Sequence, residues 1–181
     1  ANIKRLKKRY ADVLDKSVGR GVSFHIAPAN VPINFAYSLV MGLLAGNACI
    51  VRVSSKEFPQ TDIICSALEK VLEEVEFRNF RDAISIVTYG HSDAINKYFS
   101  GMSDVRVIWG GDQTINNIRS ARLPPRATEI TFADRISGLI INAETYLQIK
   151  DKPGIARSFY NDTYLSSQNA CSSPRFIYWY G

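Results

Sequence analysis

One cysteine of this 181-residue chain lies among side chains that could support chemistry. In the stretch SSQNACSSP, Cys171 follows Gln168 and Asn169 and precedes Ser172 and Ser173. Hydrogen-bond donors around a partly exposed thiol lower its pKa and favour the reactive thiolate. A nucleophile is therefore one interpretation of Cys171. The other is an inert small residue, which is the commoner role of a cysteine in a folded domain.

A stiffened loop presents an asparagine after the first strand-like segment. Pro28 and Pro32 restrict the backbone of APANVPINF, and Asn30 lies between them. An amide held rigidly at the end of a strand can donate a hydrogen bond to a developing oxyanion. The alternative is that Asn30 only caps a helix or stabilises the turn.

Two further turns could hold phosphate groups. Arg52 ends the segment ACIVRVS beside Ser54 and Ser55, and a guanidinium flanked by hydroxyls suits a phosphate, although a lone loop arginine is commonly a surface charge. Gly110 and Gly111 allow a tight turn into a helix whose free N–H groups could face a pyrophosphate. These turns contain no GxGxxG fingerprint, Walker loop or GxSxG elbow.

Short apolar segments alternate with longer amphipathic ones around these turns. The pattern predicts strands at 21–27, 48–54, 83–89, 105–109, 127–132, 137–143 and 175–181, and helices at 34–47, 58–77, 92–100, 111–121 and 152–168. Strands that are apolar on both faces and separated by helices indicate a doubly wound α/β fold with a mostly parallel sheet. Ligands of such sheets bind beyond the carboxyl ends of the strands, where the turns above lie.

Composition excludes several classes of protein. No run of about 20 apolar residues could form a transmembrane segment, and no secretory signal is evident, so we expect a soluble cytoplasmic protein. Three widely spaced cysteines and two histidines indicate reduced thiols and no metal site. The formal charge of +5 gathers in IKRLKKRY, within an amphipathic helix expected over residues 1–20, and we interpret it as a solvated helix face rather than a nucleic-acid site.

Three motifs together resemble the fatty acyl-CoA reductase (LuxC-like) branch of the aldehyde dehydrogenase superfamily. FHIAPANVP is similar to the segment with the oxyanion asparagine, GLLAGNACIVR to the helix and strand that lead to the cofactor ribose, and SSQNACSSP to the acyl-accepting cysteine motif. The resemblance implies an NADP(H)-binding Rossmann-like domain over residues 21–167 and the start of a truncated catalytic domain over residues 168–181. On the same ground, we expect the chain to be a piece of a longer enzyme and inactive by itself.

The resemblance also implies an activity, the NADPH-dependent reduction of a long-chain fatty acyl-CoA to an aldehyde. Cys171 would attack the thioester and expel coenzyme A, while Asn30 and the Cys171 N–H hold the oxyanion. Arg52 takes the position of a ribose-binding lysine and Ser55 that of an acidic residue, which favours the 2′-phosphate of NADPH. The expected cofactor-binding set is Arg52, Ser54, Ser55, Gly110 and Gly111. Acyl-transferring protein partners and a homo-oligomer are further expectations for the full-length protein.

The direction of the reaction depends on a catalytic base. Aldehyde-oxidising relatives carry a glutamate in an ELGG motif, where an ungapped comparison places Phe132, with Glu129 three residues before it. Reduction needs no activated water, so the missing base favours reduction. A gap that brings Glu129 into register, or a role for His25, stays open. Two other functions remain: NAD-dependent aldehyde oxidation, which yields an acid, and a non-catalytic nucleotide- or acyl-binding module, which forms no covalent adduct.

Overall fold

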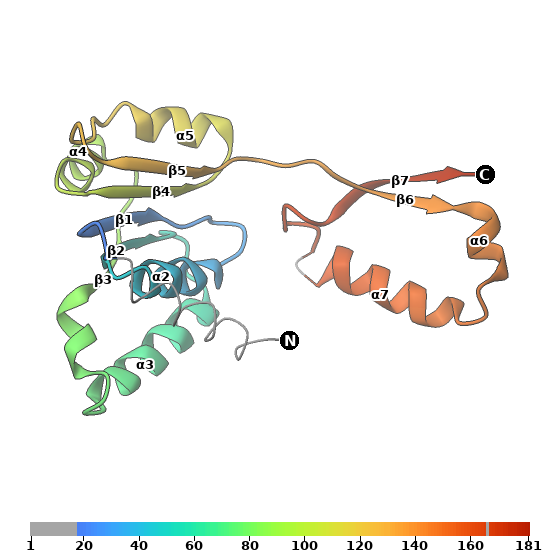
Figure 1. Cartoon of the computed structure of the whole chain (residues 1–181), viewed down its shortest axis with the longest axis horizontal. Helices are drawn as coiled ribbons and strands as arrows, with labels where there is room; N and C mark the ends of the chain where they lie inside the picture. The colour runs from blue at the N-terminus through green and yellow to red at the C-terminus, as the bar shows by residue number, and fades with distance from the viewer. Residues whose placement is uncertain (1–17, 166) are drawn as a thin grey trace.

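The computed structural model describes residues 18–165 and 167–181. The basic helix expected over residues 1–20 therefore lies almost entirely outside the described residues. The described chain forms a larger part around a five-stranded sheet and a smaller part that extends from it (Figure 1). No helix in these two stretches is both long and apolar enough to cross a bilayer.

The larger sheet contains five parallel strands in the order β3-β2-β1-β4-β5. These strands are β1 (Val22–Ile26), β2 (Ala48–Val53), β3 (Ile84–Thr88), β4 (Val105–Trp109) and β5 (Thr128–Phe132). The chain starts in the middle of the sheet, runs outward through β2 and β3, and returns to continue on the other side of β1. The predicted doubly wound parallel sheet is thus confirmed, and its switch point lies between β1 and β4.

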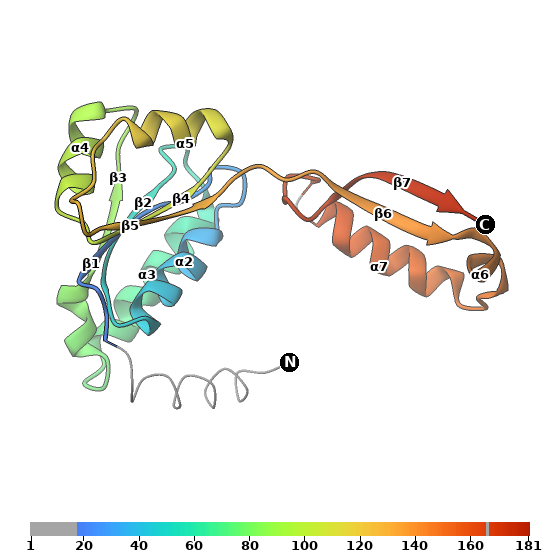
Figure 2. The ribbon, with the colours of Figure 1, turned by 45° about the horizontal axis from the view of Figure 1, so that its top comes forward.

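Helices cover both faces of this sheet (Figures 1 and 2). One face carries α2 (Asn34–Leu44) and α3 (Pro59–Glu73), and the other carries α4 (Asp93–Gly101) and α5 (Asp112–Arg119). Each face has its own apolar cluster: Phe35, Leu39, Cys49 and Val51 under α2 and α3, and Phe24, Ile26, Ile108, Ile115 and Ile118 under α4 and α5. A 3-10 helix, η1 (Arg78–Ala83), precedes β3 and was not expected from the sequence.

The turn between α2 and β2 shows how the sequence ends a helix here. Gly46 has a φ of 79°, in the left-handed region that glycine adopts without strain. Asn47 follows, is buried, and accepts hydrogen bonds through Oδ1 from the backbone N–H groups of Arg20 and Gly21. This pair therefore closes α2 and fixes where the chain enters β1.

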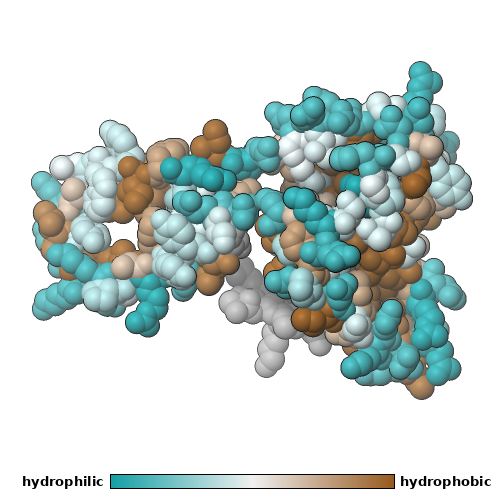
Figure 3. All heavy atoms as spheres, turned by 180° about the vertical axis from the view of Figure 1, so that it is seen from behind, coloured by the Kyte–Doolittle hydropathy of each residue, from teal (hydrophilic) through white to brown (hydrophobic). Residues whose placement is uncertain are grey.

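The smaller part is built from residues 137–180. Its two parallel strands are β6 (Ser137–Asn142) and β7 (Pro174–Tyr180), connected through α6 (Ala143–Gln148) and α7 (Lys152–Tyr164). The strand expected at the end of the chain thus has a partner in β6, which precedes it. Figure 3 shows hydrophobic side chains at the surface of both parts, and Phe176, Tyr178, Trp179 and Tyr180 of β7 are all exposed.

The larger sheet ends at Phe132, well before residue 167, to which we expected the cofactor-binding domain to extend. The physical reason is that β6 finds its hydrogen-bond partner in β7 and not in β5. The proposed division into domains at residues 20 and 167 stays a prediction.

Candidate active site

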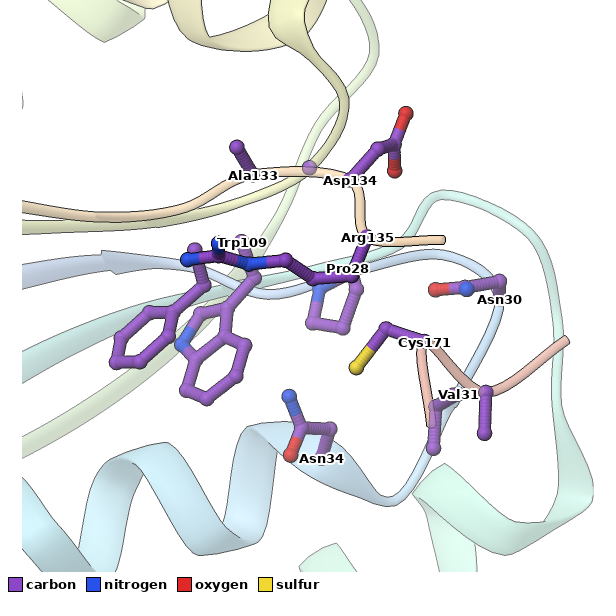
Figure 4. A pocket seen from close by; sticks show the side chains of 12 residues that line it. Pro28, Asn30, Val31, Asn34, Trp109, Ala133, Asp134, Arg135 and Cys171 are labelled. Carbon is purple, nitrogen blue, oxygen red and sulfur yellow. The ribbon is translucent and has the colours of Figure 1, made fainter. Parts of the chain in front are cut away.

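A cavity of about 300 Å³ lies at the carboxyl end of the larger sheet, where the chain passes to the smaller part (Figure 4). It receives residues from the β1–α2 loop, the ends of β4 and β5, and the turn before β7. The lining residues include Pro28, Asn30, Asn34, Trp109, Gly110, Phe132, Asp134, Arg135 and Cys171. The cavity therefore joins two of the sequence motifs, although they lie about 140 residues apart in the sequence.

Cys171 lies on a sharply reversed segment after α7. Ser167 and Gln168 have φ angles of 49° and 59°, a left-handed conformation that costs non-glycine residues about 1 kcal/mol each. Ser137 Oγ donates a hydrogen bond to the Cys171 carbonyl at 2.7 Å. Cys171 is exposed, whereas Cys49 is buried. The Cys171 sulfur points into the cavity (Figure 4). The turn that presents this thiol to the cavity therefore contains two residues with a strained backbone.

Asn30 links the β1–α2 loop to the cysteine turn. Its Nδ2 donates a hydrogen bond to the Asn169 carbonyl at 2.6 Å, two residues before Cys171. An amide group carries two N–H donors, so the second remains for another acceptor. Asn34, on the first turn of α2, also lines the cavity and was not expected there from the sequence.

Two stacked aromatic rings form one wall of the cavity. Trp109 and Phe132 end the neighbouring strands β4 and β5, and their ring centroids lie 3.7 Å apart with an interplanar angle of 8°. Phe132 stands where oxidising relatives were expected to carry a glutamate. The wall beside the thiol is therefore apolar.

The two residues that could have supplied a base from elsewhere have other roles. Glu129 forms ion pairs with Arg106 and Arg119 and does not line the cavity. Burial alone would raise the pKa of Glu129, but hydrogen bonds from Arg119 and Arg106, together with their charges, hold it below its usual value. His25 is buried between the hydroxyls of Ser23 and Ser38, each 2.8 Å away, and burial lowers its pKa to about 4.

Asp134 lines the cavity and was missed from the sequence, although an acidic residue two positions after a strand end was a usable signal. Its carboxylate points away from the Cys171 sulfur (Figure 4) and lies against Gly111, where an added Cβ would be 2.5 Å from Oδ2. A side chain at position 111 would therefore displace the Asp134 carboxylate, and Gly111 does not have a positive φ. The same carboxylate opposes a pyrophosphate at this end of α5, so the predicted role of Gly110 and Gly111 gains no support from the local charge.

A second cavity, of about 440 Å³, lies between α4 and α5 beside Arg52. Arg52 donates to the Tyr89 carbonyl at 3.1 Å, and its guanidinium lies 4.8 Å from the centre of the Tyr89 ring. Its Nε is buried and has no hydrogen-bond partner among the described residues. Ser54 and Ser55 do not line this cavity, so the structure separates them from the arginine with which they were grouped.

Comparison with known families gives this arrangement a context. The sequence profile described as "Acyl-CoA reductase (LuxC)" matches residues 3–180. The chain belongs to the LuxC family. This LuxC chain is 29% identical over 169 residues to long-chain acyl-protein thioester reductase 2 of Photobacterium leiognathi, covering 92% of this chain and 33% of the relative. The long-chain acyl-protein thioester reductase of Aliivibrio fischeri is 25% identical over 173 residues, covering 94% of this chain and 34% of the relative.

Solved structures place the LuxC chain in the aldehyde dehydrogenase fold. A putative aldehyde dehydrogenase from Burkholderia cenocepacia superposes with a TM-score of 0.71 at 19% identity, over 97% of this chain and 39% of that one. PnpE from Pseudomonas sp. WBC-3, in a complex with nicotinamide adenine dinucleotide, gives 0.68 at 15% identity, over 90% of this chain and 31% of that one. The predicted family and fold are confirmed, and the chain spans about a third of the length of the curated relatives it matches.

Proposed function

We propose that the full-length protein reduces a long-chain acyl thioester to an aldehyde through an acyl-enzyme on Cys171. The observation that carries this proposal is the single cavity into which the Cys171 sulfur points and which Asn30 also lines. Membership of the LuxC family supports the reaction class. The relatives named above are called acyl-protein thioester reductases, and the family is described by acyl-CoA. Both substrates offer the same thioester carbonyl, and we propose that long-chain acyl-CoA is accepted.

In the proposed reaction, the Cys171 thiolate adds to the thioester carbonyl and forms a new carbon–sulfur bond. The carbonyl oxygen gains negative charge, and the amide of Asn30 and the backbone N–H of Cys171 donate hydrogen bonds to it. The carbonyl then re-forms as the carrier thiolate leaves, so the acyl group remains on Cys171. The bond from Asn30 to the Asn169 carbonyl positions the amide beside the turn before substrate arrives.

We assign the second cavity to the adenosine end of a nicotinamide cofactor. The buried, unpartnered Nε of Arg52 offers a hydrogen bond that an anionic oxygen would satisfy. When bound, NADPH would supply the hydride that releases the acyl group as aldehyde. Arg52 is the proposed contact to the 2′-phosphate. Cofactor-binding roles for Ser54, Ser55, Gly110 and Gly111 remain predictions, and the geometry of this cavity gives them no further support.

The cavity favours reduction over hydrolysis of the acyl-enzyme. An acid product requires a base that activates water beside the thioester. Phe132 and Trp109 present carbon surfaces there, and the Asp134 carboxylate points away from the sulfur (Figure 4). Among the described lining residues Asp134 is the one carboxylate, so none of them places a base against the thioester to activate water.

Product analysis on the full-length protein tests the reaction. Incubation with a long-chain acyl-CoA and NADPH should yield fatty aldehyde, and the Cys171→Ala variant should yield none while binding the cofactor normally. Free acid as the main product would favour the oxidising or hydrolytic alternative. Cofactor binding without any product or adduct would favour a non-catalytic module.

Arg52→Ala tests the choice of cofactor. Loss of a charge-assisted hydrogen bond to the 2′-phosphate should weaken NADPH binding about tenfold or more while changing NADH binding little. Lys56→Ala is the matched control, because Lys56 is a nearby exposed cation that does not line the cavity. Equal losses for both cofactors would refute the role of Arg52. A cytoplasmic location, a homo-oligomer and acyl-transferring partners remain predictions.

A further inference from the structure

The cavity beside Arg52 contains a second side chain that can carry positive charge. His91 lines it from the loop between β3 and α4, and the expected cofactor-binding set did not include this residue. His91 is exposed and makes no hydrogen bond or ion pair with the described residues. Its side chain is thus available to a ligand that enters this cavity.

We propose that His91 is a specificity-determining residue that binds the 2′-phosphate of NADPH together with Arg52. The inference rests on the proposed function, since it requires a nicotinamide cofactor in this cavity. It goes further because it assigns part of the preference for a phosphorylated cofactor to a residue on the loop between β3 and α4.

Arg52 and His91 both line the cavity, and Tyr89 contacts the first and lies close to the second in the sequence. The Arg52 guanidinium is held by the Tyr89 carbonyl and stacks over the Tyr89 ring. Tyr89 begins the loop that carries His91 two residues later. The contacts that anchor the guanidinium therefore also tie it to the loop of His91, and they leave the Arg52 Nε free of partners.

His91 matters for phosphate binding because the other two charged side chains of the lining offset each other. Arg52 contributes one positive charge from β2 and Asp93 contributes one negative charge from the first turn of α4, so these two offset each other. The residues contributed by α5 and the turn after it, Thr114, Asn116, Asn117, Ile118 and Ser120, are uncharged, as are Ser92 and Asn96 around the start of α4. Besides Arg52, His91 is therefore the lining residue that can place a positive charge beside a phosphate.

NADH lacks the 2′-phosphate, so its affinity should not depend on His91. A charged hydrogen bond at an exposed position should change the affinity for NADPH by about tenfold at most.

The test measures the dissociation constants of NADPH and NADH for the full-length protein, using the quenching of protein fluorescence. His91→Gln should weaken NADPH binding about fivefold to tenfold and leave NADH binding unchanged. His91→Lys, which places a positive charge at this position, should retain the preference for NADPH. Lys97→Gln is the matched control, because Lys97 is exposed on α4 and does not line the cavity.

The outcomes separate this inference from the proposed function. If Arg52→Ala removes the preference for NADPH and His91→Gln leaves the NADPH/NADH ratio unchanged, the role of His91 is overturned and the cofactor assignment stands. If neither variant changes the ratio, the 2′-phosphate does not bind in this cavity and both fail. If the His91→Lys variant loses the preference, positive charge is not what His91 contributes, and the inference is also overturned.

Discussion

Replacing Glu129 with alanine should lower the free energy of unfolding by about 3 kcal/mol, because it removes the counterion of a buried guanidinium. The Arg106 side chain is 3% exposed and Glu129 is its ion-pair partner. Leaving a buried ion without its partner costs about 3–5 kcal/mol. The lower end applies, since Arg106 also donates to Ser100 Oγ and to the carbonyls of Ile118 and Ala121, which the substitution does not touch.

Arg119→Ala provides the matched control, because it removes the other partner of the same carboxylate. The Arg119 side chain is 52% exposed, so its pair with Glu129 should contribute less than about 1 kcal/mol. Urea unfolding followed by far-ultraviolet circular dichroism measures both variants, with an unchanged m-value as the sign that only stability has changed. If Glu129→Ala costs no more than Arg119→Ala, the structural role of Glu129 is wrong.

The pH dependence of the same variant gives an independent check. Burial raises the pKa of Glu129, but hydrogen bonds and charges from Arg119 and Arg106 more than offset it, so the pKa in the folded state lies below the ordinary value. The stabilisation is therefore complete above the unfolded pKa of about 4.3 and is lost as the pH falls through the folded value. Glu129→Ala should lose this part of the acid sensitivity.

Two further predictions follow from residues in and near the site. Asn30→Ala should slow the acylation of Cys171 in the full-length protein about 100-fold, as for the loss of one oxyanion donor, and an unchanged single-turnover rate would remove Asn30 from the mechanism. Because burial lowers the pKa of His25 to about 4, the free energy of unfolding should fall by up to about 3 kcal/mol as the pH drops from about 6.5 towards 4. His25→Gln should abolish that dependence in acid-unfolding curves, and a curve that keeps it would place the titrating group elsewhere.

The larger sheet could be predicted from the sequence because its inner strands β1 and β4 are buried on both faces. Segments such as VSFHI and VRVIW are almost uninterruptedly buried, and the helices between them repeat their apolar residues every three to four positions. In the smaller part, one helix and one strand pairing could not be predicted in this way. The helix α6 has six residues, too few to show a period, and follows β6 directly with Asn142 as its N-cap. The parallel pairing of β6 with β7 depends on packing across α6 and α7, which no local pattern reveals.

Some residues of the candidate site could likewise be predicted from the sequence, and others could not. Asn30 and Cys171 were identified by residue type within their motifs, and the structure lets them share one cavity. Asp134 and His91 lie on loops without a motif, and their place in a cavity depends on which strands are neighbours. The grouping of Arg52 with Ser54 and Ser55 followed proximity in sequence, but β2 ends at Val53 and both serines lie in the loop beyond it. Arg52, still within the strand, lines the cavity between α4 and α5, while the serines lie outside that cavity.

The most direct test of the account is the intact mass of the full-length protein after incubation with a long-chain acyl-CoA in the absence of NADPH. Wild-type protein should gain the mass of one acyl group, which peptide mapping should place on Cys171, and later addition of NADPH should remove it as aldehyde. The Cys171→Ala variant should gain no mass while remaining folded and binding the cofactor. An acyl group on the Cys171→Ala variant, or no acyl group on folded, cofactor-binding wild-type protein, would contradict the assignment of Cys171 as the acyl acceptor.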